Sequence, residues 1–546
     1  MLLRYLKKIF YNSVAELRQK RIRRFNLRRC AFAAIFLCAA SSVFAQGYPE
    51  TSYKLSDDKT VLESWKGDET DIDMNSDANL KGVNEIADYA FDGNTNVKSI
   101  VIGENVKTIG AGAFLDCTSL EKVVMPDGLE TIGRAGFSSC TELKNVVLPT
   151  SLKSMGNSVF YNCAAIDKII IPAEVTSVPD GAFNSCYSLS SVTFGDKVET
   201  IGEEAFKLCS SLTEISFPVS LKEIGTNAFV ECSQLSGINF NTSLETIGKG
   251  AFSGCGLTSL DMSGLSALQT VKIQAFLDCA KLSVLVLPDH VVSFASGAFQ
   301  GCTSLTEVTI PDSYKEIGVK MFQGCTALEK LTLGANLETI GNGAFFECTA
   351  LKDIAWNDKL TRIDWSAFYS CKSLDDITLP ESVEYIDDYV FQDCSGLLSV
   401  SLGSRVSHIG TECFSGLSGL QQFSVYAVEP PSLGSYVFNL TPVNKCKLLV
   451  PEESIDKYKE TEQWKDFMTT TTSIASVSEG QMPLIRVSPG MLNIDNMNDG
   501  SAVSVYTLAG QKVYSAASDS GSMSVALQSG MYVVCINDVA SKVLIP

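Results

Sequence analysis

The sequence predicts an α/β-type repeat solenoid, made mostly of short parallel β-strands, with a small all-β domain behind it. A repeat of 23 residues, with two steps of 24, is marked by phenylalanine at positions 91, 114, 137, 160, 183, 206, 229, 252, 276, 299, 322, 345, 368, 391, 414 and 438. Units of this size cannot bury their own apolar faces, so they must stack around one continuous core. With 45% hydrophobic and 19% charged residues, the chain is also too apolar for disorder.

Residues 1–45 have the layout of a cleaved export signal. Ten Lys or Arg and one acid, Glu16, precede an apolar run from Cys30 to Ala40, and the small-residue site Val43-Phe44-Ala45 follows. The apolar run is too short to span a bilayer comfortably, although the long basic start leaves a retained membrane anchor as the alternative. Without residues 1–45 the net charge is −28, from 33 basic and 61 acidic side chains. Such a charge opposes binding to nucleic acid.

Residues 46–82 are expected to cap the N-terminal end, because an open solenoid exposes its core. Trp65 is available to cover the first turn, and three apolar stretches predict strands: Tyr53-x-Leu55, Val61-Leu62 and Ile72-x-Met74. The series Asp71-x-Asp73-x-Asn75-x-Asp77 resembles the start of a calcium loop. It lacks the glycine and the glutamate of such a loop, where Ser76 and Gly82 stand, so we predict no metal site.

Sixteen frames form the solenoid, residues 83–451. In each frame the same residues return, as in Val106-x-x-Ile109-Gly110-x-x-Ala113-Phe114-x-x-Cys117-x-x-Leu120-x-x-Val123-x-Met125-Pro126. The Leu-x-x-Val-x-Met stretch has inward residues two apart, which predicts one short parallel strand per turn on a concave sheet. The Ile-Gly-x-x-Ala-Phe stretch predicts a tight turn and a short helical or irregular convex segment.

Thirteen of the eighteen cysteines stand three residues after the repeat phenylalanine. Many cysteines in an exported chain favour a disulfide framework. One cysteine per turn at one interior position instead predicts a ladder of buried free thiols, since parallel Cβ vectors suit a disulfide poorly. Buried thiols without a histidine partner are not catalytic.

The chain after the solenoid divides into three parts. Residues 452–467 predict a capping helix with Tyr458, Trp464 and Phe467 on its apolar face, and the Thr/Ser-rich residues 468–483 predict a linker. Residues 484–546 predict a small β-sandwich-like domain with alternating strands, around Val503-x-Val505-Tyr506-x-Leu508, Leu527-x-x-Gly530-x-Tyr532-Val533-Val534 and Lys542-Val543-Leu544-Ile545.

The repeat frame resembles the 23-residue, Treponema-type leucine-rich repeat of the BspA-like bacterial surface proteins. This resemblance implies a right-handed leucine-rich-repeat horseshoe or rod, displayed outside a bacterial cell and used in adhesion. The tail resembles the C-terminal sorting domain of type IX secretion in Bacteroidota, on Val505-Tyr506-x-Leu508-x-Gly510-Gln511-x-Val513 and Gly530-x-Tyr532-x-Val534. It implies export across two membranes and attachment outside by secretion machinery, with the tail removed or retained; otherwise the tail is a structural module only.

No catalytic group or cofactor site is expected. The chain has only two histidines, His290 and His408, both expected to face solvent in turns. The carboxylates are spread over exposed repeat positions without a paired arrangement, and the glycines follow the repeat period. We therefore expect no enzyme and no cofactor.

Two departures from the repeat are candidate ligand surfaces. One is an outward row of Val124, Val147 and Ile170, where later turns carry Thr193, Ser216 and Asn239; β-propensity alone also explains it. The other is a group of extra aromatic residues on neighbouring turns, which marks a binding hot spot or packing of the convex layer: Phe346, Trp365, Tyr369, Tyr385 and Tyr389.

The expected function is that of an exported cell-surface protein that binds an extracellular protein or glycan as an adhesin. The alternative is a spacer of the cell envelope without a ligand of its own, and the periplasm is the alternative location. Neither the ligand nor the oligomeric state follows from the sequence.

Overall fold

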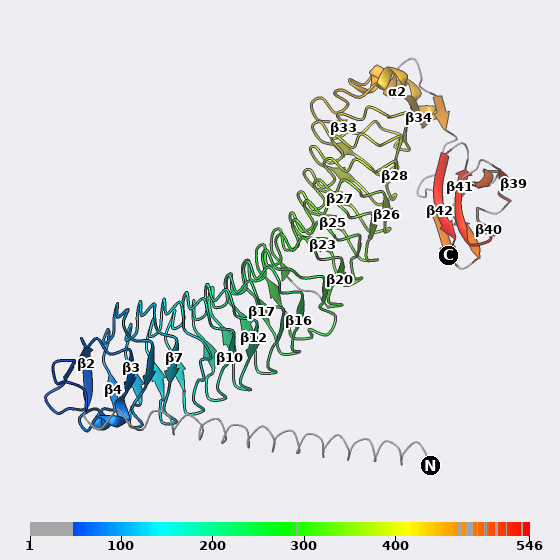
Figure 1. Ribbon diagram of the computed structural model, residues 1–546. Coiled ribbons are helices and arrows are strands. Elements are labelled where there is room, and N and C mark those ends of the chain that lie inside the picture. Colours follow the sequence, from blue (N-terminus) through cyan, green and yellow to red (C-terminus); the bar gives the residue numbers. More distant parts are fainter. Residues whose placement is uncertain are drawn as a thin grey trace, which may run out of the picture.

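The computed structural model describes residues 47–290, 293–467, 472–474, 484–488, 490–495, 497, 500–507, 511–519, 521–536 and 539–545. The expected export signal and most of the expected linker lie outside these residues. Figure 1 shows a long rod of stacked turns that bends near its middle, with a small β-unit after its C-terminal end.

The first side of the rod, the main sheet face, carries the predicted strand of every turn except the one with residues 145–147. Ile100, Val123 and their equivalents point into the core and the flanking residues point outward. The strands pair in parallel, in several sheets. They are β3 (Asp71–Asp73), β5 (Ser99–Val101), β7 (Lys122–Val124), β10 (Lys168–Ile170), β12 (Ser191–Thr193), β14 (Glu214–Ser216), β16 (Gly237–Asn239), β18 (Ser259–Asp261), β20 (Val284–Val286), β22 (Glu307–Thr309), β24 (Lys330–Thr332), β26 (Asp353–Ala355), β28 (Asp376–Thr378), β30 (Ser399–Leu402), β32 (Gln422–Val425) and β34 (Lys447–Pro451).

The second side, the lateral face, carries a second strand per turn that the sequence did not predict. Each is two residues long, such as Thr108–Ile109, with the second residue buried in all but β21 and β33, where Phe294 and Leu433 are half-buried. Two residues are too few to display a period, so only a turn was expected there. These strands are β4 (Glu85–Ile86), β6 (Thr108–Ile109), β8 (Thr131–Ile132), β9 (Ser154–Met155), β11 (Ser177–Val178), β13 (Thr200–Ile201), β15 (Glu223–Ile224), β17 (Thr246–Ile247), β19 (Thr270–Val271), β21 (Ser293–Phe294), β23 (Glu316–Ile317), β25 (Thr339–Ile340), β27 (Arg362–Ile363), β29 (Tyr385–Ile386), β31 (His408–Ile409) and β33 (Ser432–Leu433).

The third side, the Phe side, is irregular backbone without a helix. In all sixteen frames the residues two before and two after the repeat phenylalanine have positive φ, as at Gly112 and Asp116. This turns alternate N–H groups toward the next turn: Phe114 donates to Gly136 at 2.8 Å. The buried rings stack from Phe91 to Phe438 with centroids 4.7 to 6.2 Å apart.

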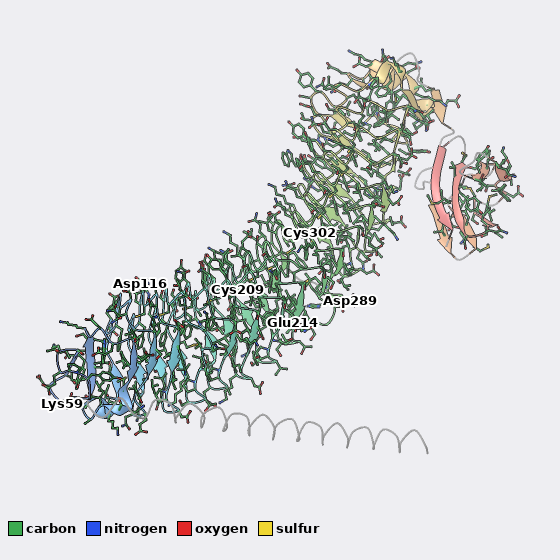
Figure 2. The ribbon with its side chains drawn as sticks, viewed as in Figure 1. Lys59, Asp116, Cys209, Glu214, Asp289 and Cys302 are labelled. Atoms are coloured by element: carbon green, nitrogen blue, oxygen red, sulfur yellow. The ribbon has the colours of Figure 1, made fainter. Side chains whose placement is uncertain are left out.

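The curvature differs from the expectation of a concave sheet. In Figures 1 and 2 the Phe side, marked by Asp116, lies on the inner side of the bend, and the main sheet face, marked by Glu214, lies on the outer side. Wide helices opposite a narrow sheet would force the sheet side inward. Here all three sides are hydrogen-bonded backbone at similar spacing, so nothing imposes that curvature.

Both ends of the rod are closed. At the N-terminal end β1 (Tyr53–Leu55) pairs with β2 (Val61–Trp65), which continues the lateral face. Trp65 stacks on Phe91 at 5.6 Å, as predicted. At the C-terminal end the α-helix α2 (Ile455–Glu460) is accompanied by three short 3-10 helices: Val443–Lys445, Glu452–Ser454 and Trp464–Phe467. The α-helix is therefore shorter than the sequence predicted. Trp464 packs edge-on against Phe438 at 5.3 Å.

The chain after this cap returns to the rod and then forms a separate unit. β35 (Thr472–Ile474), inside the segment expected to be a linker, pairs in parallel with β34. The tail has two antiparallel sheets around a small core of its own that includes Val503, Val505 and Val534. Its strands are β36 (Leu484–Ser488), β37 (Met491–Asp495), β38 (Ala502–Thr507), β39 (Lys512–Ala517), β40 (Met523–Ala526), β41 (Gly530–Ile536) and β42 (Val539–Ile545).

Candidate functional site

The predicted aliphatic row is an exposed strip on the main sheet face. Val124, Val147 and Ile170 stand on three successive turns and are 39%, 70% and 61% exposed. On the next turns the same position is polar, beginning with Thr193. Contiguous exposed aliphatic side chains are a feature of interaction surfaces, whereas single ones are ordinary. We call Val124, Val147 and Ile170 the aliphatic strip.

The middle rung of this strip does not form a regular strand. The sequence did not predict this departure. Among the described turns, residues 145–147 form the one rung of the main sheet face without a strand. Asn145 has φ +53, and the N–H groups of Asn145 and Val147 have no hydrogen-bond partner among the described residues. Asn is the residue, after Gly, that best tolerates this conformation, so an Asn at a strand position was an available signal.

The five predicted aromatic residues do not form one surface. Phe346 and Tyr369 are half-buried on the Phe side and stack on each other, with centroids 4.7 Å apart and planes 6° apart. The Tyr369 hydroxyl donates to Asp393 Oδ2 at 3.1 Å. Burial, the carboxylate Asp393 and other nearby acids raise the pKa of Tyr369. This pair is engaged in packing between turns.

Tyr385 belongs to a different side, the lateral face. Its ring lies between the Arg362 guanidinium, 4.3 Å away, and the His408 ring, 4.6 Å away. Arg362 in turn forms ion pairs with Asp364 and, at 3.6 Å, Asp387. With both faces covered, Tyr385 offers no stacking platform to a sugar.

Trp365 is the aromatic residue of this group with the most open side chain, 44% exposed. Tyr389 meets it edge-on, with ring centroids 6.1 Å apart. Trp365 is therefore the member of the group that has surface available for a ligand.

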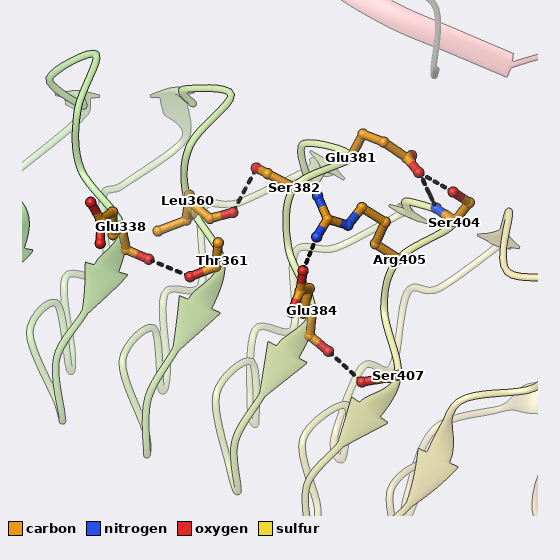
Figure 3. Close-up of polar contacts among 9 residues, drawn as sticks. All are labelled: Glu338, Leu360, Thr361, Glu381, Ser382, Glu384, Ser404, Arg405 and Ser407. Carbon is orange, nitrogen blue, oxygen red and sulfur yellow. Dashed lines mark hydrogen bonds and ion pairs between the residues drawn. The ribbon is translucent and has the colours of Figure 1, made fainter. Parts of the chain in front are cut away.

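Polar contacts around these turns run mostly from one turn to the next. In Figure 3 the Glu381 carboxylate accepts from Ser404, and Glu384 pairs with Arg405. The Ser407 hydroxyl donates to the Glu384 carbonyl at 3.1 Å. Such exposed ion pairs contribute little individually.

The thirteen ladder cysteines are buried free thiols, and each donates to a main-chain carbonyl. Cys186 Sγ, for example, lies 3.2 Å from the carbonyl oxygen of Phe160, the phenylalanine of the preceding frame. In the last frame Thr441 takes the cysteine's place and donates to Phe414 at 2.7 Å. Burial raises the pKa of Cys186, Cys279 and Cys325 to about 12, which keeps these thiols neutral.

The remaining residues considered for chemistry are engaged elsewhere. The buried Asp77 carboxylate accepts from the N–H groups of Tyr48 and Asn79, and so ties the N-terminal cap together. No cluster of three or more potential metal ligands occurs in the part of the chain that the structure describes. Both histidines are half-buried rather than fully solvent-facing: His290 bonds the Leu268 carbonyl at 2.8 Å and His408 bonds Ser432 at 3.0 Å.

The fold and this surface define a leucine-rich-repeat scaffold, and the comparisons with known proteins identify its family. The family model described as BspA type leucine rich repeat region, with six copies, matches overlapping stretches between residues 84 and 444. The chain therefore belongs to the BspA-type leucine-rich-repeat family. The search of curated proteins returned no match.

The chain is also similar to solved structures of bacterial proteins, the first of which has the same fold. A leucine-rich repeat protein from Bacteroides ovatus is 27% identical with a TM-score of 0.57; the match covers 77% of this chain and 97% of that chain. A leucine rich cell surface protein from Faecalibacterium prausnitzii is 27% identical, covering 70% and 94%, with a TM-score of 0.37. The pneumococcal vaccine antigen PcpA is 19% identical, covering 77% and 94%, with a TM-score of 0.38.

Proposed function

We propose that this chain is an exported surface protein that binds an extracellular protein or glycan, as an adhesin does. The observation that carries the proposal is the aliphatic strip. The rod has sixteen frames whose interior positions are satisfied by packing, so an exposed aliphatic row on three successive turns serves no core. Removing such a row from water on contact with a partner would stabilise a complex.

Export and attachment belong to the same proposal. Residues 1–45 would direct export, and the tail from residue 484 would engage outer-membrane secretion and attachment machinery. Two features support this role for the tail: it has its own antiparallel core, and a short segment joins it to the parallel rod. None of the helices that the structure describes has the length and apolarity needed to cross a membrane.

The function proposed is binding and not turnover. The thirteen ladder thiols are buried and already donate hydrogen bonds, and the described histidines face a carbonyl and a hydroxyl. Leucine-rich-repeat rods supply a long preformed surface, which suits recognition of a macromolecule.

The test is saturable binding of the purified chain to immobilised host matrix proteins, to glycans and to whole neighbouring bacteria. We expect Val147→Glu with Ile170→Glu to weaken binding at least tenfold, because it places charge in the contact. The matched control is Val284→Glu with Val286→Glu, an exposed pair on a distant rung. A double variant Trp365→Ala with Tyr369→Ala tests the aromatic residues. Absence of saturable binding to all three would support the spacer alternative instead.

A further inference from the structure

The surroundings of the aliphatic strip differ in charge from the rest of the main sheet face. Over the strip's three turns and the turn before them, the two outward positions that precede each inward strand residue carry four lysines and two carboxylates: Lys98, Lys122, Lys144 and Lys168 against Glu121 and Asp167. From Ser190 to Gln422 the same two positions carry two lysines and six carboxylates. The strip therefore lies in the one basic stretch of these positions, on a strongly acidic protein.

The strip also offers main-chain hydrogen-bonding groups. At the irregular rung, residues 145–147, two N–H groups have no partner among the described residues, and Asn145 and Val147 are exposed. On the neighbouring rungs β7 and β10 pair regularly with β5 and β12. Main-chain N–H groups without an internal partner can donate a hydrogen bond to a main-chain carbonyl of a bound peptide, as such groups do where a peptide adds to the edge of a sheet; residues 145–147 carry two of them inside the stack.

We propose that the aliphatic strip is a docking site for an extended, acidic peptide segment of a partner protein. Apolar side chains of the segment would contact Val124, Val147 and Ile170. Its carboxylates would face Lys98, Lys144 and Lys168, and its main chain would bond the irregular rung. Charge complementarity favours a small acidic peptide over larger occupants. A second copy of this chain or a polyanionic lipid surface would extend beyond the small basic stretch and be repelled by the net negative charge of the rod around it. This inference rests on the proposed function and adds the chemistry of the partner.

The four turns with these lysines span about 14 Å, the reach of roughly five extended residues. The probe is a fluorescent peptide somewhat longer than this that alternates Glu and Val, compared with peptides alternating Lys and Val or Glu and Ser. With the full chain, fluorescence anisotropy should show binding of the Glu/Val peptide at least tenfold tighter than of the other two. Raising the salt concentration should weaken it, because exposed charges are screened.

Three variants separate the parts of the site. Lys98→Glu with Lys168→Glu should abolish the preference for Glu/Val over Lys/Val. Val147→Glu should weaken Glu/Val binding at least tenfold, and Asn145→Val, which favours a regular strand, should weaken it while leaving the fold intact by circular dichroism. Val284→Glu with Val286→Glu is the control and should change nothing.

Equal binding of the three peptides, or binding unaffected by the lysine and Val147 variants, would overturn the inference. The proposed function of binding an extracellular partner is tested separately from this inference. A chain that binds matrix proteins through Val147 but shows no preference among the peptides keeps its function and loses this partner chemistry.

Discussion

The ladder thiols link single residues to the pH dependence of stability. In the folded chain the pKa of Cys186, Cys279 and Cys325 is about 12, whereas a thiol in an unfolded chain has a pKa near 8.5. Because the folded pKa is raised, the stabilisation is complete below about pH 8.5 and is lost as the pH rises toward 12. Between these two pKa values, each such thiol lowers the free energy of unfolding by about 1.4 kcal/mol per pH unit.

Replacing Cys186, Cys279 and Cys325 together by threonine should therefore flatten the alkaline decline of the free energy of unfolding by about 4 kcal/mol per pH unit. Threonine keeps a donor for the phenylalanine carbonyl, as Thr441 does in the last frame. Denaturant unfolding at several pH values above 8.5 measures the slope. The same triple variant at neutral pH is the control for packing, and an unchanged slope would show that these thiols ionise freely in the folded chain.

At the scale of the element, what the sequence could predict depended on how long each pattern is. The spacing of Phe and Cys predicted the stack and the thiol ladder, because each position recurs over many turns. The lateral strands were missed, since Thr108 and Ile109 display no period by themselves. The positive φ values on the Phe side were equally hidden, because Leu208 and Glu412 adopt them as well as glycine does. There the hydrogen bonds to the next turn outweigh local preference.

The two candidate surfaces also differ in how well the sequence predicted them. Val124, Val147 and Ile170 were found by comparison with later turns, and their exposure follows directly from strand alternation. The aromatic residues were grouped by closeness in sequence, but Tyr385 and Tyr369 stand on different sides of the rod. Because each turn has three sides, residues that are close in sequence can lie on different sides of the rod. The lateral strands were not predicted, so nothing in the sequence indicated that Tyr385 lies on a separate face.

The C-terminal cap is an element whose removal should act locally. Trp464 is almost fully buried against Phe438 and Phe423, so Trp464→Ala should cost about 3 to 5 kcal/mol of local stability. In a repeat protein each turn contacts only its neighbours. Hydrogen exchange should therefore speed up in β32 and β34 and stay unchanged around β12. The exposed Trp365→Ala is the matched control, and uniform loss of protection along the rod would contradict this local picture.

At the scale of the whole molecule, one core runs the length of the rod. Its ring stack begins at Trp65, continues through sixteen phenylalanines and ends at Trp464. Every frame donates from the Phe side to the next and accepts from the one before. Because these contacts repeat with the sequence period, any internal turn can be exchanged for its neighbour without a change of register. Length in this protein therefore sets reach, while the two caps set where the rod ends.

Removing one whole frame should consequently leave a folded, shorter rod. Deletion of residues 300–322 joins Phe299 to Gln323, so the next ring, Phe345, falls one period later and the hydrogen-bond register is retained. Small-angle scattering should show a rod shorter by about 5 Å, one strand spacing, with an unchanged circular dichroism spectrum per residue. Deletion of residues 300–310 is the control: it breaks the period, places polar residues in the core and should cause cooperative loss of the turns around it. If both deletions fold equally well, the 23-residue register does not specify the stack.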